Sequence, residues 1–107
     1  MNLEHINVFI VVVETGNLSA AAQTLYTSQS NISRKISQLE SEVGIPLIYR
    51  SKGQQSIELT AAGYEFLDYA RQIQSLTKDI DSIAKNINRK FGSSGVPVGK
   101  IRGRNAR

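Results

Sequence analysis

The chain has 107 residues, 21% of them charged, with a formal net charge of +4, no cysteine and a single histidine. This length allows one small domain with an additional extended element, and the lack of cysteine excludes disulfides, thiol chemistry and cysteine-based zinc sites, which suits a reducing cytoplasm. The longest apolar run covers only residues 8–13 and the N-terminus has no basic flank, so we predict neither a membrane span nor a signal peptide.

The positive charge is concentrated at one end of the chain. Residues 92–107 contain four basic side chains and no acidic one, whereas residues 1–91 contain nine of each. Net charge is therefore weak evidence for a nucleic-acid partner, and the argument depends on where individual basic residues lie.

Residues 3–14 predict the first helix. Apolar residues at 3, 6, 9, 10 and 13 follow a helical period, although the run 8–13 also resembles a buried strand. We favour the helix because Asn2 is a suitable N-cap and Gly16 a suitable stop. The additional valines predict that other helices pack around it.

Residues 17–44 have the pattern of a helix-turn-helix, two short helices with a polar break between them. The first is expected to begin at Ser19, whose hydroxyl can cap it, and to continue through three alanines to Tyr26. Alanines let another helix cross closely.

The second helix is predicted over residues 28–43. Thr27 or Ser28 can cap it, and Gly44 ends it. Its apolar residues form one stripe that is expected to face the core: Ile32, Ile36, Leu39 and Val43.

The opposite face of this second helix is short, polar and cationic near its start. Its members are Ser30, Arg34, Ser37 and Ser41, with Gln29 and Ser33 to one side and Lys35 to the other. Such a face suits a helix in the DNA major groove, where N-terminal residues reach base edges. An ordinary solvated face is an equally good interpretation of the helix taken alone.

Residues 45–59 predict a two-stranded hairpin, or wing. Residues 45–50 are extended in character, 51–55 form a turn and 56–59 alternate polar and apolar residues. A wing would place Arg50 and Lys52 within reach of phosphates or a minor groove. A solvated surface hairpin is the alternative.

Residues 60–91 contain no clear breaker and predict a helix of about 32 residues, roughly 48 Å long if continuous. Spacings of 4, 3, 4, 3 and 4 form a coiled-coil seam of Tyr69, Ile73, Leu76, Ile80, Ile83 and Ile87. We expect a homodimer through this seam, and the alternative is that the stripe packs back on its own domain. The start of the helix is expected to pack on the domain through Ala61, Ala62, Gly63, Phe66 and Leu67, with Gly63 allowing a close approach.

Residues 92–107 have linker composition and no periodicity, so we predict a flexible basic tail. Its basic side chains would add nonspecific nucleic-acid affinity. A truncated linker and an expression-vector remnant remain open interpretations.

In this order of elements, residues 1 to about 90 closely resemble the N-terminal DNA-binding region of the LysR-type transcriptional regulators. The resemblance rests on many matches in register: Leu3, Phe9, Gly16-Asn17-Leu18-Ser19-Ala20-Ala21-Ala22, Ser28-Gln29, Ser33-Arg34, Ile36, Leu39-Glu40, Glu42, Gly44, Pro46-Leu47, Arg50, Leu59-Thr60 and Ala62-Gly63. The chain departs from the family pattern at Ser30-Asn31, where proline-alanine is frequent, at Ile48, where phenylalanine is common, and at Gln54-Gln55, where a basic wing is frequent.

The resemblance implies a mainly α fold, a winged helix-turn-helix followed by a long dimerising linker helix. It also implies a homodimer that reads an interrupted palindrome in double-stranded DNA. By position, Gln29 is the expected base reader with Ser30 or Ser33 assisting, while Ser28, Ser33 and Arg34 are expected phosphate contacts. Arg50 and Lys52 would belong to the wing. An effector site is expected only in the family's C-terminal domain, which this sequence does not include.

We therefore expect a DNA-binding domain over residues 1–59, a dimerisation helix over 60–91 and a tail over 92–107, belonging to a cytoplasmic bacterial transcription regulator without a cofactor. A coiled-coil protein-interaction module that does not bind DNA is the alternative function. An enzyme is not expected, because the serines have no neighbouring histidine or cysteine base, and Glu40 with Glu42 is interpreted as a solvated pair near a helix end.

Overall fold

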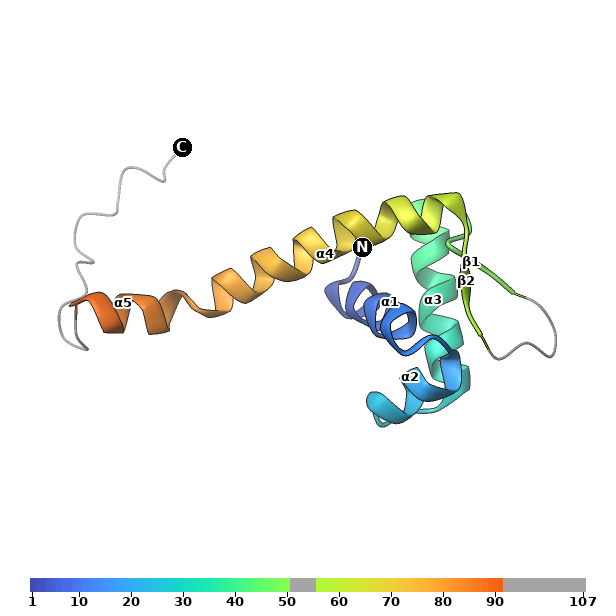
Figure 1. Ribbon diagram of the computed structural model, residues 1–107, viewed down its shortest axis with the longest axis horizontal. Coiled ribbons are helices and arrows are strands. Elements are labelled where there is room, and N and C mark those ends of the chain that lie inside the picture. The colour runs from blue at the N-terminus through green and yellow to red at the C-terminus, as the bar shows by residue number, and fades with distance from the viewer. Residues whose placement is uncertain (51–55, 92–107) are drawn as a thin grey trace. The chain divides into compact units, whose positions relative to one another are not determined.

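The structure, a computed structural model, describes residues 1–50 and 56–91, and the chain divides into two compact units, Met1–Gln74 and Ser75–Arg107 (Figure 1). The mainly helical fold with a small two-stranded hairpin is confirmed. The elements are α1 (Leu3–Thr15), α2 (Leu18–Thr24), α3 (Gln29–Val43), β1 (Ile48–Tyr49), β2 (Glu58–Leu59), α4 (Ala61–Asp81) and α5 (Ile83–Phe91). The predicted loop 51–55, with Lys52, and the predicted tail 92–107 lie outside the described residues.

Helix α1 forms where the sequence predicted a helix and not a strand. The Asn2 side chain accepts a hydrogen bond from the Glu4 amide at 2.7 Å, and Gly16 ends the helix with φ +86°, in the left-handed region that favours glycine. The helix is buried on more than one side, as its valines predicted. Its buried side chains are those of His5, Ile6, Val8, Phe9, Ile10 and Val12.

Helix α2 begins and ends earlier than predicted. Its cap is Asn17, not Ser19, because Asn17 keeps an extended backbone and its side-chain oxygen accepts a hydrogen bond from the Ala20 amide at 2.6 Å. Asparagine is as good a cap as serine. The predicted extension to Tyr26 is also wrong, since the helix ends at Thr24 and Tyr26 takes a φ of +54°.

Helix α3 follows the prediction closely. Ser28 is its cap and accepts a hydrogen bond from the Asn31 amide at 3.0 Å, while Gly44 ends it with φ +93°. The predicted stripe enters the core through Ile32, Ile36 and Leu39, each with 0% of its surface exposed. This burial fixes which face of α3 is left for other molecules.

The hairpin pairs Ile48 with Leu59 and Tyr49 with Glu58 in antiparallel register, so its strands are shorter than the predicted extended segments. The chain entering β2 also contacts the loop before α2, because the Ile57 amide donates to the Gly16 carbonyl at 2.9 Å. The hairpin is thus attached to the loop between α1 and α2.

The first part of α4 completes the core of the first unit. Phe66 meets Phe9 edge to face, with ring centroids 5.2 Å apart at 82°. A Cβ added to Gly63 would lie 2.1 Å from the Leu47 carbonyl oxygen, so the predicted close approach is confirmed. Ala62, Phe66 and Leu67 pack on the core as predicted, whereas Ala61 is exposed, contrary to the prediction.

The predicted long helix is interrupted once, at Ser82. The Ser82 hydroxyl donates to the Lys78 carbonyl at 2.8 Å, and α5 begins at the next residue. A serine that bonds back to the preceding turn is a known cause of helix bending. Among the described residues, no helix is both long enough and apolar enough to cross a membrane.

Candidate functional site

The polar face of α3 is open to solvent, as its helical spacing predicted. Gln29, Ser30, Arg34 and Ser37 are exposed, and Ser33 is partly exposed. Leu18 at the start of α2 lies beside this face, and together with four of its residues it lines a recess of about 570 Å³, half polar in character. The first turns of α3 therefore present amide, hydroxyl and guanidinium groups on one accessible surface.

Asn31 organises the first turns of α3. Its Nδ2 donates to the Thr27 hydroxyl at 2.8 Å, and its Oδ1 accepts a hydrogen bond from Nη2 of Arg34. Arg34 is thereby oriented along the exposed face. The sequence showed Asn31 only as a departure from the family pattern, although an asparagine three residues before an arginine on one helix face was a usable signal.

Lys35 does not share the open surface with Arg34. Its ammonium forms an ion pair with Glu4 of α1, and its side chain is 20% exposed against 59% for Glu4. The hydrogen bond from Lys35 and its positive charge lower the pKa of the Glu4 carboxyl below its ordinary value. Lys35 thus connects α3 to α1.

Arg50 follows β1, and its side chain crosses to α3. Nη1 lies 3.1 Å from the Ser33 hydroxyl, and Nη2 lies 3.3 Å from the Ser37 hydroxyl and 3.2 Å from Oε1 of Glu40. Arg50 of the predicted wing and two serines of the polar face, Ser33 and Ser37, are therefore joined in one hydrogen-bonded group with Glu40.

The interpretation of Glu40 as a solvated residue is wrong. Its side chain is 15% exposed, and Oε2 accepts hydrogen bonds from the backbone amides of Leu47 at 2.8 Å and Ile48 at 3.2 Å. The segment that leaves α3 folds back over the carboxylate and supplies these donors. Glu42, by contrast, is exposed as expected.

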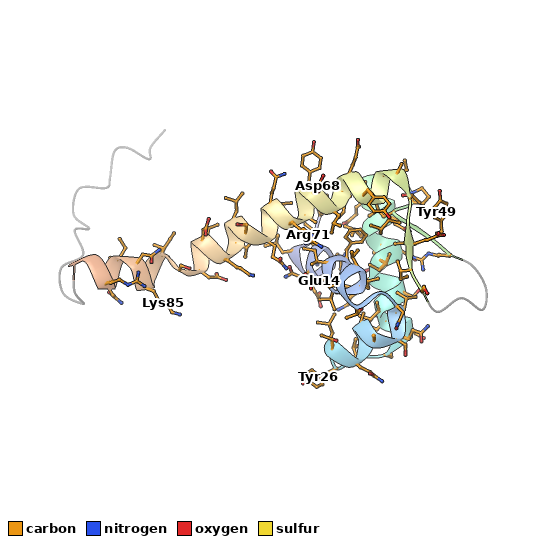
Figure 2. The ribbon with its side chains drawn as sticks, in the orientation of Figure 1. Glu14, Tyr26, Tyr49, Asp68, Arg71 and Lys85 are labelled. Atoms are coloured by element: carbon orange, nitrogen blue, oxygen red, sulfur yellow. The ribbon has the colours of Figure 1, made fainter. Side chains whose placement is uncertain are left out.

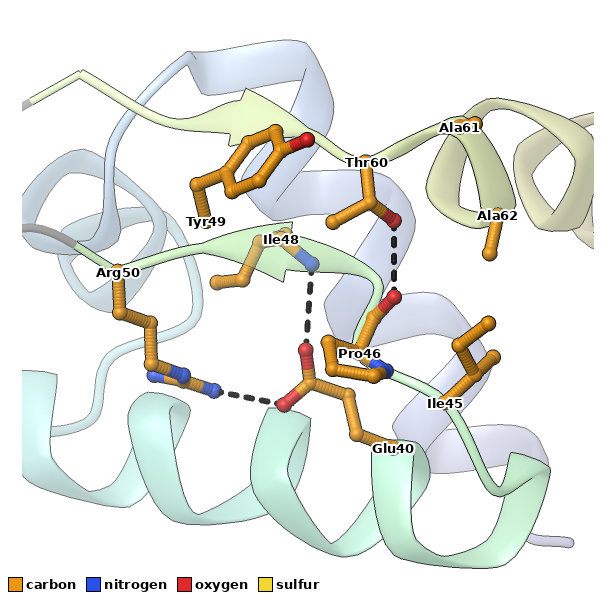
Figure 3. A pocket seen from close by; sticks show the side chains of 9 residues that line it. All are labelled: Glu40, Ile45, Pro46, Ile48, Tyr49, Arg50, Thr60, Ala61 and Ala62. Atoms are coloured by element: carbon orange, nitrogen blue, oxygen red, sulfur yellow. Dashed lines mark hydrogen bonds and ion pairs between the residues drawn. The ribbon is translucent and has the colours of Figure 1, made fainter.

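Glu40 and Arg50 also form the charged part of the wall of a groove of about 530 Å³ between α3, β1 and the start of α4 (Figure 3). The other lining residues are Ile45, Pro46, Ile48, Tyr49, Thr60, Ala61 and Ala62. Because the two charged side chains bond to each other, the groove offers mainly apolar surface.

The turn between α2 and α3 exposes a large aromatic side chain. Tyr26 is 95% exposed and points out from the helices, as Figure 2 shows. Across the described residues, no three histidine or carboxylate side chains are grouped so that they could hold a metal ion.

The residues of the predicted seam are mostly exposed. In the first unit Tyr69 is 65% exposed, while Ile73 packs against the core. In the second unit Leu76, Ile80 and Ile83 are 61%, 64% and 55% exposed, and Ile87 is partly buried. Within the first unit, Ile73 thus packs on its own domain, as the alternative for the stripe expects.

Residues 3–64 match a family model described as bacterial regulatory helix-turn-helix protein, lysR family. A similar protein is the HTH-type transcriptional regulator TcbR of Pseudomonas sp. (strain P51), which is 45% identical over 76 residues, covering 71% of this chain and 25% of TcbR. The chain spans about a quarter to a third of the length of the curated relatives that it matches first.

Solved structures of similar fold include protein–DNA complexes. The crystal structure of the CbnR_DBD–DNA complex aligns with a TM-score of 0.73 and 40% identity, covering 80% of this chain and 97% of that chain. The complex of BenM_DBD with catB site 1 DNA aligns with a TM-score of 0.74 and 36% identity, covering 81% and 94%. BenM is a regulator of Acinetobacter baylyi (strain ATCC 33305 / BD413 / ADP1).

Proposed function

This chain belongs to the LysR family of bacterial regulatory helix-turn-helix proteins, and we therefore propose that it binds double-stranded DNA sequence-specifically as part of a transcription regulator. The observation that carries this proposal is the first half of α3. One of its faces is locked in the core by Ile32 and Ile36, while Gln29, Ser30 and Arg34 stand exposed on the other. Two similar structures are DNA complexes, which supports the same use of this surface.

Helix α3 enters the major groove with its N-terminal turns foremost. Gln29 reads a base edge, because a carboxamide can pair with adenine in a bidentate manner, and Ser30 or Ser33 assists. Ser28, Ser33 and Arg34 contact phosphates and set the position of the helix. Arg50 lies beside α3 at the end of β1, and a DNA contact by Lys52 stays a prediction.

The functional form is a homodimer. Leu76, Ile80 and Ile83 expose apolar side chains at coiled-coil spacing in the second unit, and a second chain would bury them. A two-fold dimer places two α3 helices in successive major grooves, roughly 34 Å apart or a multiple of that, and reads an interrupted palindrome.

The same proposal makes the chain a non-enzymatic protein that acts on DNA in the bacterial cytoplasm, because its relatives are named as transcriptional regulators. An effector site in the family's C-terminal domain, which the sequence resemblance implies, stays a prediction. The relatives and the DNA complexes give no support to the alternative of an interaction module that does not bind DNA.

Binding to duplex DNA across a salt series tests the proposal. Bound sites are first selected from a random duplex library, which returns the half-site sequence and its spacing. The logarithm of the association constant should then fall with the logarithm of salt concentration, with a slope of about −0.9 for each phosphate contact. A failure of the chain to bind any duplex in low salt would refute the proposal.

A further inference from the structure

Glu40 has a fixed position beneath the exposed face of α3. Oε2 accepts hydrogen bonds from the backbone amides of Leu47 and Ile48, at 2.8 and 3.2 Å, and Oε1 lies 3.2 Å from Nη2 of Arg50 (Figure 3). Backbone donors do not rotate as side chains do, and the Glu40 side chain is only 15% exposed. The carboxylate is therefore a rigid anchor and not a mobile surface charge.

This anchor determines where the guanidinium of Arg50 lies. The other acceptors of Arg50 are two neutral hydroxyls, those of Ser33 at 3.1 Å and Ser37 at 3.3 Å. A hydrogen bond between two charged groups is roughly twice as strong as a neutral one. We infer that Glu40 is a positioning residue of the DNA interface, which holds Arg50 across α3 although Glu40 itself does not contact DNA.

The same contact orients two serine hydroxyls. A guanidinium has only donors, so Ser33 and Ser37 receive it through oxygen lone pairs. The hydrogen of each hydroxyl is left to donate to another acceptor. On DNA, the acceptors that match are phosphate oxygens and the base-edge atoms N7 and O6 of guanine, N7 of adenine and O4 of thymine.

The inference rests on the proposed DNA binding and extends it, because it adds Glu40 and gives Arg50 a place on α3 instead of on the wing alone. Arg50 keeps two of its five N–H donors free of these contacts, since Nη1 uses one and Nη2 uses two. Those two donors remain for a phosphate.

The variant Glu40→Gln in the full 107-residue chain tests the inference. The carboxamide oxygen of glutamine still accepts hydrogen bonds from the backbone amides, but the side chain no longer carries the negative charge that holds Arg50. We expect about tenfold weaker binding to the selected duplex, measured by fluorescence anisotropy. Loss of a negative charge near DNA would by itself strengthen binding, so unchanged or tighter binding overturns the inference. Glu42→Gln is the matched control, because it removes the same charge from an exposed site on the same helix, and it should not weaken binding.

A double-mutant cycle separates positioning from a general structural effect. Arg50→Lys keeps the positive charge but loses the planar fork, and we expect about tenfold weaker binding here also. If Glu40 acts through Arg50, the double variant binds no more weakly than either single variant. Additive losses overturn the inference. Should Glu40→Gln fail to fold by circular dichroism, Arg50→Lys decides the question, because full affinity with lysine would show that no oriented guanidinium is needed.

Two serine variants identify the acceptor on DNA. If Ser33→Ala or Ser37→Ala weakens binding to selected and random duplexes equally, the hydroxyl meets a phosphate, and if only the selected duplex is affected, it meets a base. Unchanged binding by both variants overturns the assigned hydroxyl role. Failure of the unmodified chain to bind any duplex refutes the proposed function, whereas normal binding by Glu40→Gln refutes only the positioning role.

Discussion

The ammonium of Lys35 on α3 donates a hydrogen bond to the carboxylate of Glu4 on α1, and this ion pair ties the two helices together. Because Lys35 lowers the pKa of the Glu4 carboxyl, the pair favours the folded state only while that carboxyl is ionised. Its contribution is therefore fully present above the ordinary pKa of 4.5 and is lost as the pH falls through the lowered value.

Glu4→Gln should consequently lower the midpoint of thermal unfolding at neutral pH and have no effect at the acid end of a pH series. The expected decrease is small, because ion pairs at the surface contribute little. Circular dichroism melts across the series measure it. Glu14→Gln, which removes an exposed carboxylate from the same helix, serves as the control. A decrease that persists in acid would contradict the role of the ion pair.

Replacement of the α2 cap distinguishes Asn17 from Ser19. Asn17→Ala removes the acceptor of the Ala20 amide, and the free energy of unfolding should fall by about 0.5 to 2 kcal/mol. Ser19→Ala should change it little, because Ser19 is an exposed residue inside the helix. Urea denaturation of both variants provides the comparison, and a larger loss for Ser19→Ala would reverse the assignment.

The cap of α2 also shows how far the sequence predicts this fold. Local signals were sufficient where one residue fits one role, as with Asn2 and Gly16 at the ends of α1. They were insufficient where two polar residues fit equally well, as with Asn17 and Ser19, since backbone conformation decides between them. The break at Ser82 could not be predicted for a similar reason. A serine inside a helix can point to solvent or bond back to the carbonyl of the preceding turn, as Ser82 does.

The residues of the candidate site likewise fall into those that local signals predict and those that depend on distant contacts. Helical periodicity placed Gln29, Ser30 and Arg34 on one exposed face, because that face depends only on local geometry. Periodicity placed Lys35 beside this face, but it could not reveal the ion pair with Glu4, which lies 31 residues earlier in the chain. Glu40 is bound by amides seven and eight residues later, in a segment whose path the sequence did not specify. Helical periodicity predicts the face on which a residue lies, but it does not predict contacts with residues distant in the sequence.

Two substitutions on α3 distinguish phosphate contacts, which position the helix, from contacts that recognise a base. Arg34→Ala should weaken binding to all duplexes about equally and reduce the salt slope by about one phosphate contact. Gln29→Ala should reduce discrimination at one base pair by about 1 to 3 kcal/mol. Competition binding with single-base variants of the selected site measures both effects. Gln38→Ala, exposed further along the helix, should do neither. The opposite pattern for Arg34 and Gln29 would refute the assigned roles.

Ile80 tests whether the exposed stripe of the second unit forms the dimer. Ile80 is 64% exposed in the single chain, and its burial against a second chain would contribute about 1.5 to 3 kcal/mol before the entropy of association is subtracted. Ile80→Asp would place a charge in that interface, so sedimentation should show monomers. Ser75→Asp introduces the same side chain at an exposed position off the seam and should leave the dimer intact. If Ile80→Asp remains dimeric, the chains associate through another surface.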